Sequence, residues 1–243
     1  MTPFSSALSV DEFLLVREAG YRPAGLVLGS AVVRLARRRR PRSSRTDVEL
    51  TTWSLPLLQA KVSAVARLRD EAALLGAAGV IGVDIAVSRK GLRGSISEVV
   101  ATGTAVHGPS TERPFTCRLT GQQFWMLLRS GRVPVGLVMG ASAYYRTTTP
   151  RGLMAYTPAL NDENPWRTEG VYRARELALG QMTGAARGLG ASSTVGVSVE
   201  ETSGGWVTSY GAVTEFFMTG TAVRDLASPP RAPYPLRMLP LSG

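Results

Sequence analysis

The chain has 243 residues, a formal net charge of +10 and a hydrophobic content of 44%, values typical of a globular protein long enough for two domains. Its longest uncharged apolar run, residues 133–145, is shorter than the roughly 20 residues that a membrane-spanning helix needs. A single cysteine excludes an internal disulfide framework. The amino terminus has no basic start followed by an apolar stretch, so we expect a cytoplasmic protein without a membrane span.

Two stretches of the chain repeat one pattern. Residues 8–32 and 119–143 align without a gap at an offset of 111 and match at eight positions. Farther along, the sequence TGTAV occurs twice, starting at Thr102 and again at Thr219. We interpret this pattern as the tandem duplication of one small domain. The predicted parts are repeat 1 (residues 1–110), repeat 2 (residues 111–226) and an extended proline-rich tail (residues 227–243).

The first helix of each repeat begins with a capping box. In repeat 1, the Ser9 hydroxyl can accept from the amide of Glu12, and the Glu12 carboxylate can accept from the amide of Ser9. In repeat 2, Thr120 and Gln123 have the same spacing. A glycine in the left-handed conformation is expected to end each helix. These glycines are Gly20 and Gly131.

A longer helix follows in each repeat. In repeat 1, Pro56 is expected at its first helical position. In repeat 2, Asn164 is expected to cap the helix ahead of Pro165. The second long helix contains several glycines, each of which costs about 1 kcal/mol relative to alanine, so we expect it to pack closely against a neighbouring element. They are Gly170, Gly180 and Gly184.

The remaining apolar segments predict strands. They are residues 24–33, 80–87 and 98–106 in repeat 1, residues 135–144, 194–199 and 215–223 in repeat 2, and a short opening strand at 115–119. The order predicts an α+β fold in which each domain packs a small, mainly antiparallel sheet against a long helix. So few strands leave exposed sheet edges, which invite pairing between domains or subunits.

An ordered set of motifs covers residues 4–107 and 115–224: GLVLG near the start, a long helix ending in LGA, then GV and a closing TGTAV. This set resembles the YbjQ-like family of small bacterial proteins, which are labelled as heavy-metal-binding domains. The resemblance implies a dodecin-like α+β unit that assembles into a ring, typically a pentamer. With two units per chain, five chains could form two stacked five-domain rings or one ring of ten domains.

The chain lacks the residues that metal sites and common catalytic sites require. Structural zinc takes four soft ligands, and catalytic zinc takes three with water, but the only histidine and the only cysteine are His107 and Cys117. We treat these two as weak metal candidates. No G-x-S-x-G elbow or lysine-containing phosphate loop is present. We therefore expect neither an enzyme nor a bound cofactor.

The positive charge is concentrated in one insert, residues 34–45. Seven of the ten net charges come from this segment, so the rest of the chain carries +3. The arginines are Arg34, Arg37, Arg38, Arg39, Arg40, Arg42 and Arg45. Such a run can bind the phosphates of nucleic acid, with an affinity that falls steeply with salt, but a solvated loop without a ligand is the alternative.

The tail at residues 227–243 is rich in proline but also carries apolar side chains. These are Tyr234, Leu236, Met238, Leu239 and Leu241. We hypothesise that the tail is a docking peptide for a neighbouring subunit or a partner protein. The sequence as a whole favours a non-enzymatic homo-oligomer that forms a ring or shell. Polyanion binding is the second hypothesis, and heavy-metal binding is the third.

Overall fold

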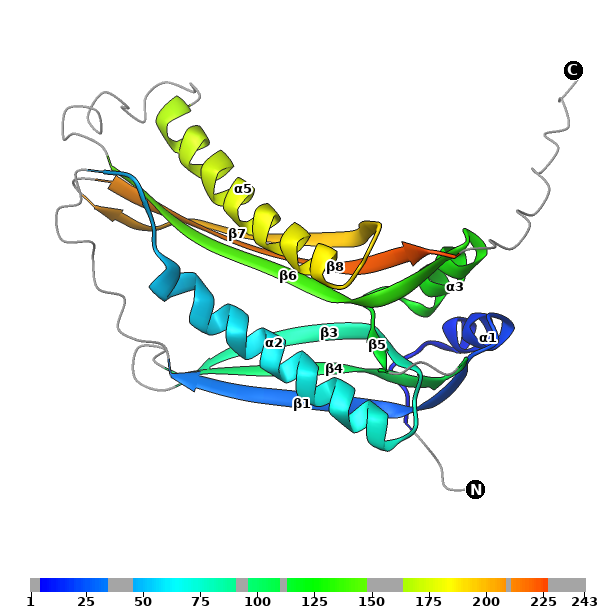
Figure 1. The fold of residues 1–243 in the computed structure, drawn as a ribbon. Helices are drawn as coiled ribbons and strands as arrows, with labels where there is room; N and C mark the ends of the chain where they lie inside the picture. The colour runs from blue at the N-terminus through cyan, green and yellow to red at the C-terminus, as the bar shows by residue number, and fades with distance from the viewer. Residues whose placement is uncertain are drawn as a thin grey trace, which may run out of the picture.

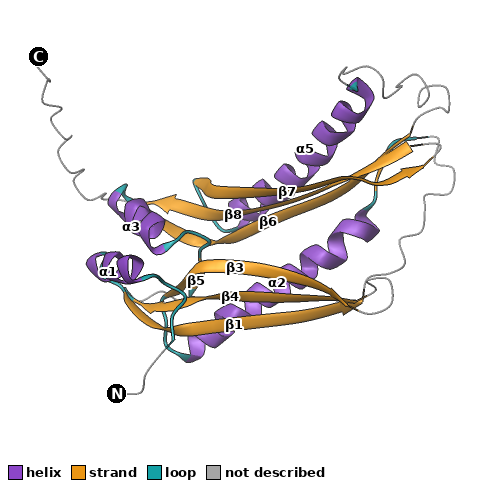
Figure 2. Ribbon diagram, turned by 180° about the vertical axis from the view of Figure 1, so that it is seen from behind, coloured by secondary structure: helices purple, strands orange, loops and turns teal. Residues whose placement is uncertain are grey.

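The computed structural model describes residues 5–34, 46–90, 96–109, 113–147, 164–208 and 211–226. Its elements are α1 (Val10–Glu18), β1 (Arg22–Arg34), β2 (Val48–Glu49), α2 (Thr51–Leu74), β3 (Gly79–Lys90), β4 (Ile96–His107), β5 (Phe115–Thr116), α3 (Gly121–Arg129), β6 (Arg132–Thr147), α5 (Pro165–Gly188), β7 (Ser193–Thr208) and β8 (Gly211–Asp225). They form two four-stranded sheets, ordered β1-β4-β3-β5 and β2-β6-β8-β7 (Figures 1 and 2). The α+β fold class is confirmed, because all the long strands pair antiparallel.

Both short helices begin as their sequences predict. The Ser9 side chain accepts from the Glu12 amide, and the Thr120 side chain accepts from the Gln123 amide, with the reciprocal bond present in each capping box. The two boxes use different residues for the same hydrogen bonds. The helix-ending glycines have φ values of 83° and 78°, the left-handed conformation that favours glycine.

The two sheets and the two long helices are arranged in layers (Figure 1). Alternate side chains of the second sheet face opposite ways: Met218 packs with residues of α5, whereas Met139 and Phe217 pack with residues of α2 and the first sheet. The second sheet is therefore covered on both faces, by α5 on one side and by α2 on the other. The first sheet has α2 on one face.

Each long helix approaches its own sheet through a strand glycine. A Cβ added to Gly29 of β1 would lie 2.0 Å from the carbonyl oxygen of Ala64, and one added to Gly140 of β6 would lie 2.0 Å from that of Ala178. Helix α5 therefore packs closely against a neighbouring element, as expected, but not through Gly180 and Gly184, which have no heavy atom within 4 Å of an added Cβ. They lie on the side of α5 that points away from its sheet.

The position of Pro56 also differs from our prediction, because α2 begins at Thr51 and Pro56 lies inside the helix. The preceding segment is fixed by β2, and the amide of Leu50 donates to the carbonyl of Ala143 in β6 over 2.6 Å. The helix therefore begins as soon as the chain leaves the second sheet. As the sixth residue of α2, Pro56 has no amide hydrogen to donate to the carbonyl of Thr52, so the second turn of the helix lacks one intrahelical hydrogen bond. None of the described helices is both long and apolar enough to cross a bilayer.

Candidate assembly interface

The two repeats exchange short strands. Strand β2 precedes α2 of repeat 1 but pairs with β6 of repeat 2, with Val48 opposite Tyr145. Strand β5 opens repeat 2 but pairs in parallel with β3 of repeat 1, with Thr116 opposite Val80. Each sheet therefore contains a strand from the other repeat, and the two repeats share main-chain hydrogen bonds.

The segment that follows β5 continues this contact along the edge of β3. The amide of Cys117 donates to the carbonyl of Val80 over 2.9 Å, and the amide of Val83 donates to the carbonyl of Cys117 over 2.9 Å. At the bulge of β3, Gly82 has a φ of 62° and its amide donates to the carbonyl of Leu119 over 3.0 Å. The left-handed glycine turns this amide toward repeat 2.

An aromatic cluster lies at the same contact between the two repeats. The ring centroid of Tyr21 lies 5.0 Å from that of Phe124 and 6.2 Å from that of Phe115, in edge-to-face geometry. The Phe115 and Phe124 rings stack with centroids 5.7 Å apart. Phe115 lies over Gly79, where an added Cβ would come within 2.4 Å of the ring. The absence of a side chain at Gly79 therefore makes room for Phe115.

Helices α1 and α3 meet beside this cluster. One carboxylate oxygen of Glu12 accepts from the amide of Ser9 over 2.9 Å, and the other accepts from the amide of Gly121 over 3.1 Å. Glu12 therefore caps its own helix and also binds the first residue of α3, a position that favours negative charge. A Cβ at Gly121 would lie 2.7 Å from the Cβ of Glu12, so the two helix starts are in close contact.

A buried lysine links α2 to the second sheet. Lys61 is 2% exposed, and its Nζ lies 3.2 Å from the centroid of the Phe217 ring and 3.5 Å from a carboxylate oxygen of Glu200. Burial lowers the pKa of Lys61 below its ordinary value, and the opposing charge of Glu200 limits the shift. The cation–π contact and the ion pair both join repeat 1 to repeat 2.

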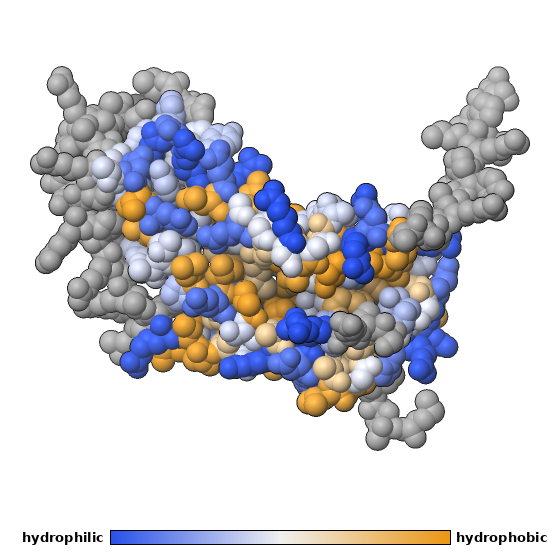
Figure 3. Space-filling view, in the orientation of Figure 1, coloured by the Kyte–Doolittle hydropathy of each residue, from blue (hydrophilic) through white to orange (hydrophobic). Residues whose placement is uncertain are grey.

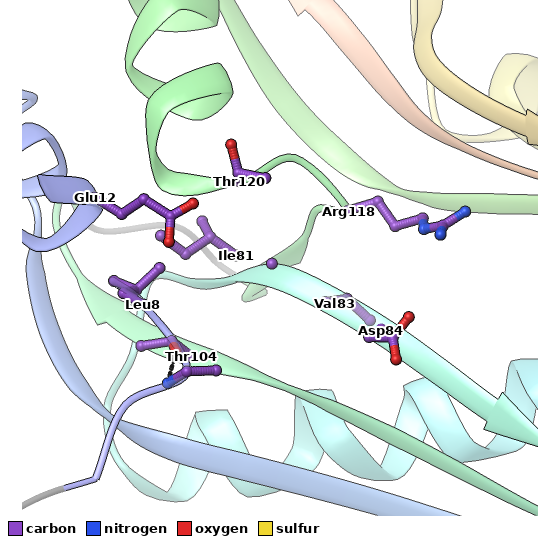
Figure 4. Close-up of a pocket in the computed structure, with 10 residues that line it drawn as sticks. Leu8, Glu12, Ile81, Val83, Asp84, Thr104, Arg118 and Thr120 are labelled. Atoms are coloured by element: carbon purple, nitrogen blue, oxygen red, sulfur yellow. Dashed lines mark hydrogen bonds between the residues drawn. The ribbon is translucent and has the colours of Figure 1, made fainter. Parts of the chain in front are cut away.

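A small half-open cavity of about 300 Å³ lies between the repeats (Figure 4). Glu12 and Thr120 lie at one end of the view, and Asp84 and Arg118 lie at the other. Its lining contains no histidine, cysteine or lysine. The cavity therefore offers neither a thiol nucleophile nor the imidazole or amine base that most common acyl-transfer sites use.

The two weak metal candidates, Cys117 and His107, lie in different surroundings. Cys117 is fully buried, burial raises the pKa of its thiol to about 12, and its Sγ accepts from the amide of Leu119 over 3.3 Å. His107 has its Nδ1 3.2 Å from the carbonyl oxygen of Gly76. Across the described ranges, no three histidine, cysteine, aspartate or glutamate side chains gather to hold a metal ion.

The other predicted site residues lie mostly outside the described residues. Arg34 is exposed at the end of β1, whereas Arg37 to Arg45 and the tail side chains Tyr234 to Leu241 are not described. Sequence reasoning missed Lys61, although its spacing of four residues from both Leu57 and Val65 places it within the apolar stripe of α2.

Comparison with known proteins finds a family model and a known protein that match the chain. A family model described as "Putative heavy-metal-binding" matches residues 43–108, which confirms the predicted family in repeat 1. An encapsulin nanocompartment protein of Mycobacterium tuberculosis, Rv1762c, is 34% identical over 235 residues, covering 93% of this chain and 87% of the relative. The second match spans both repeats.

Proposed function

Because the chain belongs to the family of the mycobacterial encapsulin nanocompartment protein, we propose that it is a non-enzymatic scaffold whose copies assemble into a ring or shell. The observation that carries this proposal is the strand exchange at the candidate assembly interface. A domain that accepts a strand from a neighbouring domain at its sheet edge can bind a further copy in the same way, since unpaired sheet edges favour pairing with another chain.

The exposed apolar surface supports the same function. Within the described residues, β1 and β7 end their sheets and carry exposed apolar side chains, including Val32 at 69% and Val199 at 52%. Apolar patches are visible on the face shown in Figure 3, where α2 and β1 lie. Exposed apolar patches are among the features that mark protein–protein contacts.

The assembly would be a homo-oligomer with closed symmetry. The five-fold ring that the YbjQ-like resemblance implies is one such closure, and a shell built from several rings is another. In this proposal the assembly is cytoplasmic, its lumen or surface holds a protein partner, and the tail at residues 227–243 contributes docking contacts.

Native mass spectrometry of the untagged protein, followed by electron microscopy of the same sample, tests the proposed function. We expect a closed multiple of the chain mass with no excess, and rings or hollow particles in the images. A monomer would contradict the proposal. Stoichiometric nucleic acid on an unassembled chain would instead favour the arginine insert as the functional site, and stoichiometric metal would favour the third hypothesis.

A further inference from the structure

The interface between the repeats has two different sides. Repeat 1 contributes what we call its helix side. It consists of the surface of α2 that faces the second sheet and the edge of β3 that does not pair with β4. Repeat 2 contributes what we call its sheet side, which consists of the outer face of β6 and the segment at residues 116–119. Since the repeats share one architecture, repeat 2 also has a helix side, formed by α5 and β7. Repeat 1 likewise has a sheet side, formed by β1 and residues 5–8.

The segment at residues 5–8 already occupies the position that residues 116–119 occupy in repeat 2. The amide of Ala7 donates to the Thr104 hydroxyl over 3.0 Å, and the amide of Arg118 donates to the Thr221 hydroxyl over 3.1 Å. Ala7 and Arg118 are counterparts at the offset of 111. This segment is therefore held on repeat 1 in the same way, but no described strand lies against its other edge.

Strand β7 presents the matching edge. Its Gly196 has a φ of 60°, the same conformation as its counterpart Gly82 at 62°. Val83, next to Gly82, is 2% exposed because it lies in a core cluster with Met139 and Phe217 of repeat 2, whereas its counterpart Val197 is 46% exposed. The difference between these two equivalent valines shows that repeat 2 covers repeat 1 here, and that no described part of the chain covers Val197 in the same way.

The outer faces of the two sheets differ in the same way. Met139 and Ala143 of β6 are 7% and 0% exposed, because Met139 packs with residues of α2 and Ala143 lies in a cluster with Leu50 and Trp53 at the start of that helix. Their counterparts on β1, Leu28 and Val32, are 48% and 69% exposed. Apolar side chains at equivalent positions are therefore covered in the second sheet and bare in the first.

The long helices complete the pattern. Val65 of α2 lies four residues after Lys61 on the side that meets the second sheet, and it is 9% exposed. Its counterpart on α5, Leu179, is 40% exposed, and Tyr172 on the same side is 55% exposed. The helix side of repeat 2 is thus apolar and uncovered, as is the sheet side of repeat 1.

We propose that these two surfaces bind each other between copies of the chain: α5 and β7 of one copy cover β1 and residues 5–8 of the next. This inference rests on the proposed function and specifies its contact. The interface is heterologous, so the copies join head to tail and close into a ring when the rotation per copy allows it. Because repeats 1 and 2 alternate around such a ring, both lie in one ring rather than in two stacked rings.

The contact between copies differs from the contact within the chain at two positions. Ser193 stands where repeat 1 has Gly79, so its Cβ occupies space that Phe115 uses within the chain. Arg175 stands where α2 has Lys61, and the counterpart of the Phe217 ring is Val100. The contact between copies therefore lacks two features of the internal one and should be the weaker, so the assembly should dissociate before the chain unfolds.

Disulfide trapping between two single variants tests the contact and its register. The pairing of Val80 with Thr116 predicts that Thr194 of one copy lies opposite Ser5 of the next. One sample carries Ser5→Cys and the other carries Thr194→Cys, and they are mixed after reversible dissociation and then oxidised. Neighbouring strands have the spacing that a disulfide requires. We expect covalent dimers in the mixture and few in either sample alone, because a head-to-tail contact never places two identical positions together.

The matched control replaces Thr194→Cys with Ser198→Cys, four residues farther along the same strand. Equal trapping in the control, or dimers of Ser5→Cys with itself, would overturn the proposed register and direction. Native mass spectrometry of each variant tests the proposed interface separately from the proposed scaffold function. Closed assemblies without the specific cross-link would overturn this interface and leave the scaffold function standing, whereas the absence of assembly in the unmodified chain would overturn both.

Discussion

The ammonium group of Lys61 lies 3.2 Å from the centre of the Phe217 ring, and this contact joins the long helix of repeat 1 to the central strand of repeat 2. A lysine so deeply buried has lost its hydration, and Glu200, which is 63% exposed on its side chain, compensates only in part. We therefore expect Lys61 to contribute more to the alignment of the two repeats than to their stability.

Lys61→Met should change how stability depends on pH. The pKa of Lys61 is lower in the folded protein than the value of 10.5 expected for the unfolded chain. Between those two pKa values the unfolded state binds more protons, so the free energy of unfolding of the natural chain should rise with pH. Below the folded pKa the full desolvation penalty remains. Urea titrations from neutral pH to about pH 10.5 should show this rise in the natural chain and not in Lys61→Met. A parallel pH dependence in the two proteins would contradict this.

Gly140→Ala and Gly180→Ala should have opposite effects on stability. A Cβ at residue 140 would meet the carbonyl oxygen of Ala178 at 2.0 Å, so we expect a loss of about 1–3 kcal/mol or failure to fold. At residue 180 the Cβ meets open space within an α-helix, so we expect a gain of about 1 kcal/mol. Thermal unfolding of both variants checks this. A destabilised Gly180→Ala that still assembles normally would argue against the open position of this glycine.

Cys117 should be nearly inert in the folded protein. With a thiol pKa of about 12, roughly one molecule in 10,000 carries a thiolate at about pH 8, against roughly one in ten for a thiol with the ordinary pKa of 9.0. We expect Ellman's reagent to react at least about 100-fold more slowly with the native protein than with the protein in concentrated urea. Rapid reaction without denaturant would show that the segment after β5 opens readily from β3. It would also mean that Cys117 is accessible enough to act as a metal ligand.

The assembly should survive high salt and metal chelation. Its proposed contacts are apolar side chains and main-chain hydrogen bonds, which charge screening at about 1 M NaCl weakens little. Binding of nucleic acid through the arginines at residues 34–45 should disappear under the same conditions. Light scattering in high salt, with and without EDTA, measures both effects. Dissociation by salt alone would indicate that charged contacts hold the interface together, and dissociation by EDTA would indicate a metal between subunits.

The local features of the fold were predictable because each depends on a few neighbouring residues. The capping boxes at Ser9 and Thr120 are complete within four residues, so each predicted a helix start although the two boxes use different residues. The duplicated motifs likewise predicted the element order and the α+β class. The start of α2 was mispredicted, because Pro56 carries a local signal that the pairing of β2 with β6 overrides.

The candidate interface depended on contacts that no local pattern encodes. Strands β2 and β5 have two residues each, too short to show any alternation, and their partners lie about 100 and 36 positions away along the chain. The burial of Lys61 depends on a ring from the other repeat. By itself the sequence determined that one set of motifs occurs twice and how the first helix of each repeat begins, since helix caps and repeated motifs are local. The tertiary structure alone decided which side of one repeat meets which side of the other, because that choice depends on the fit of two surfaces that form only after each repeat has folded.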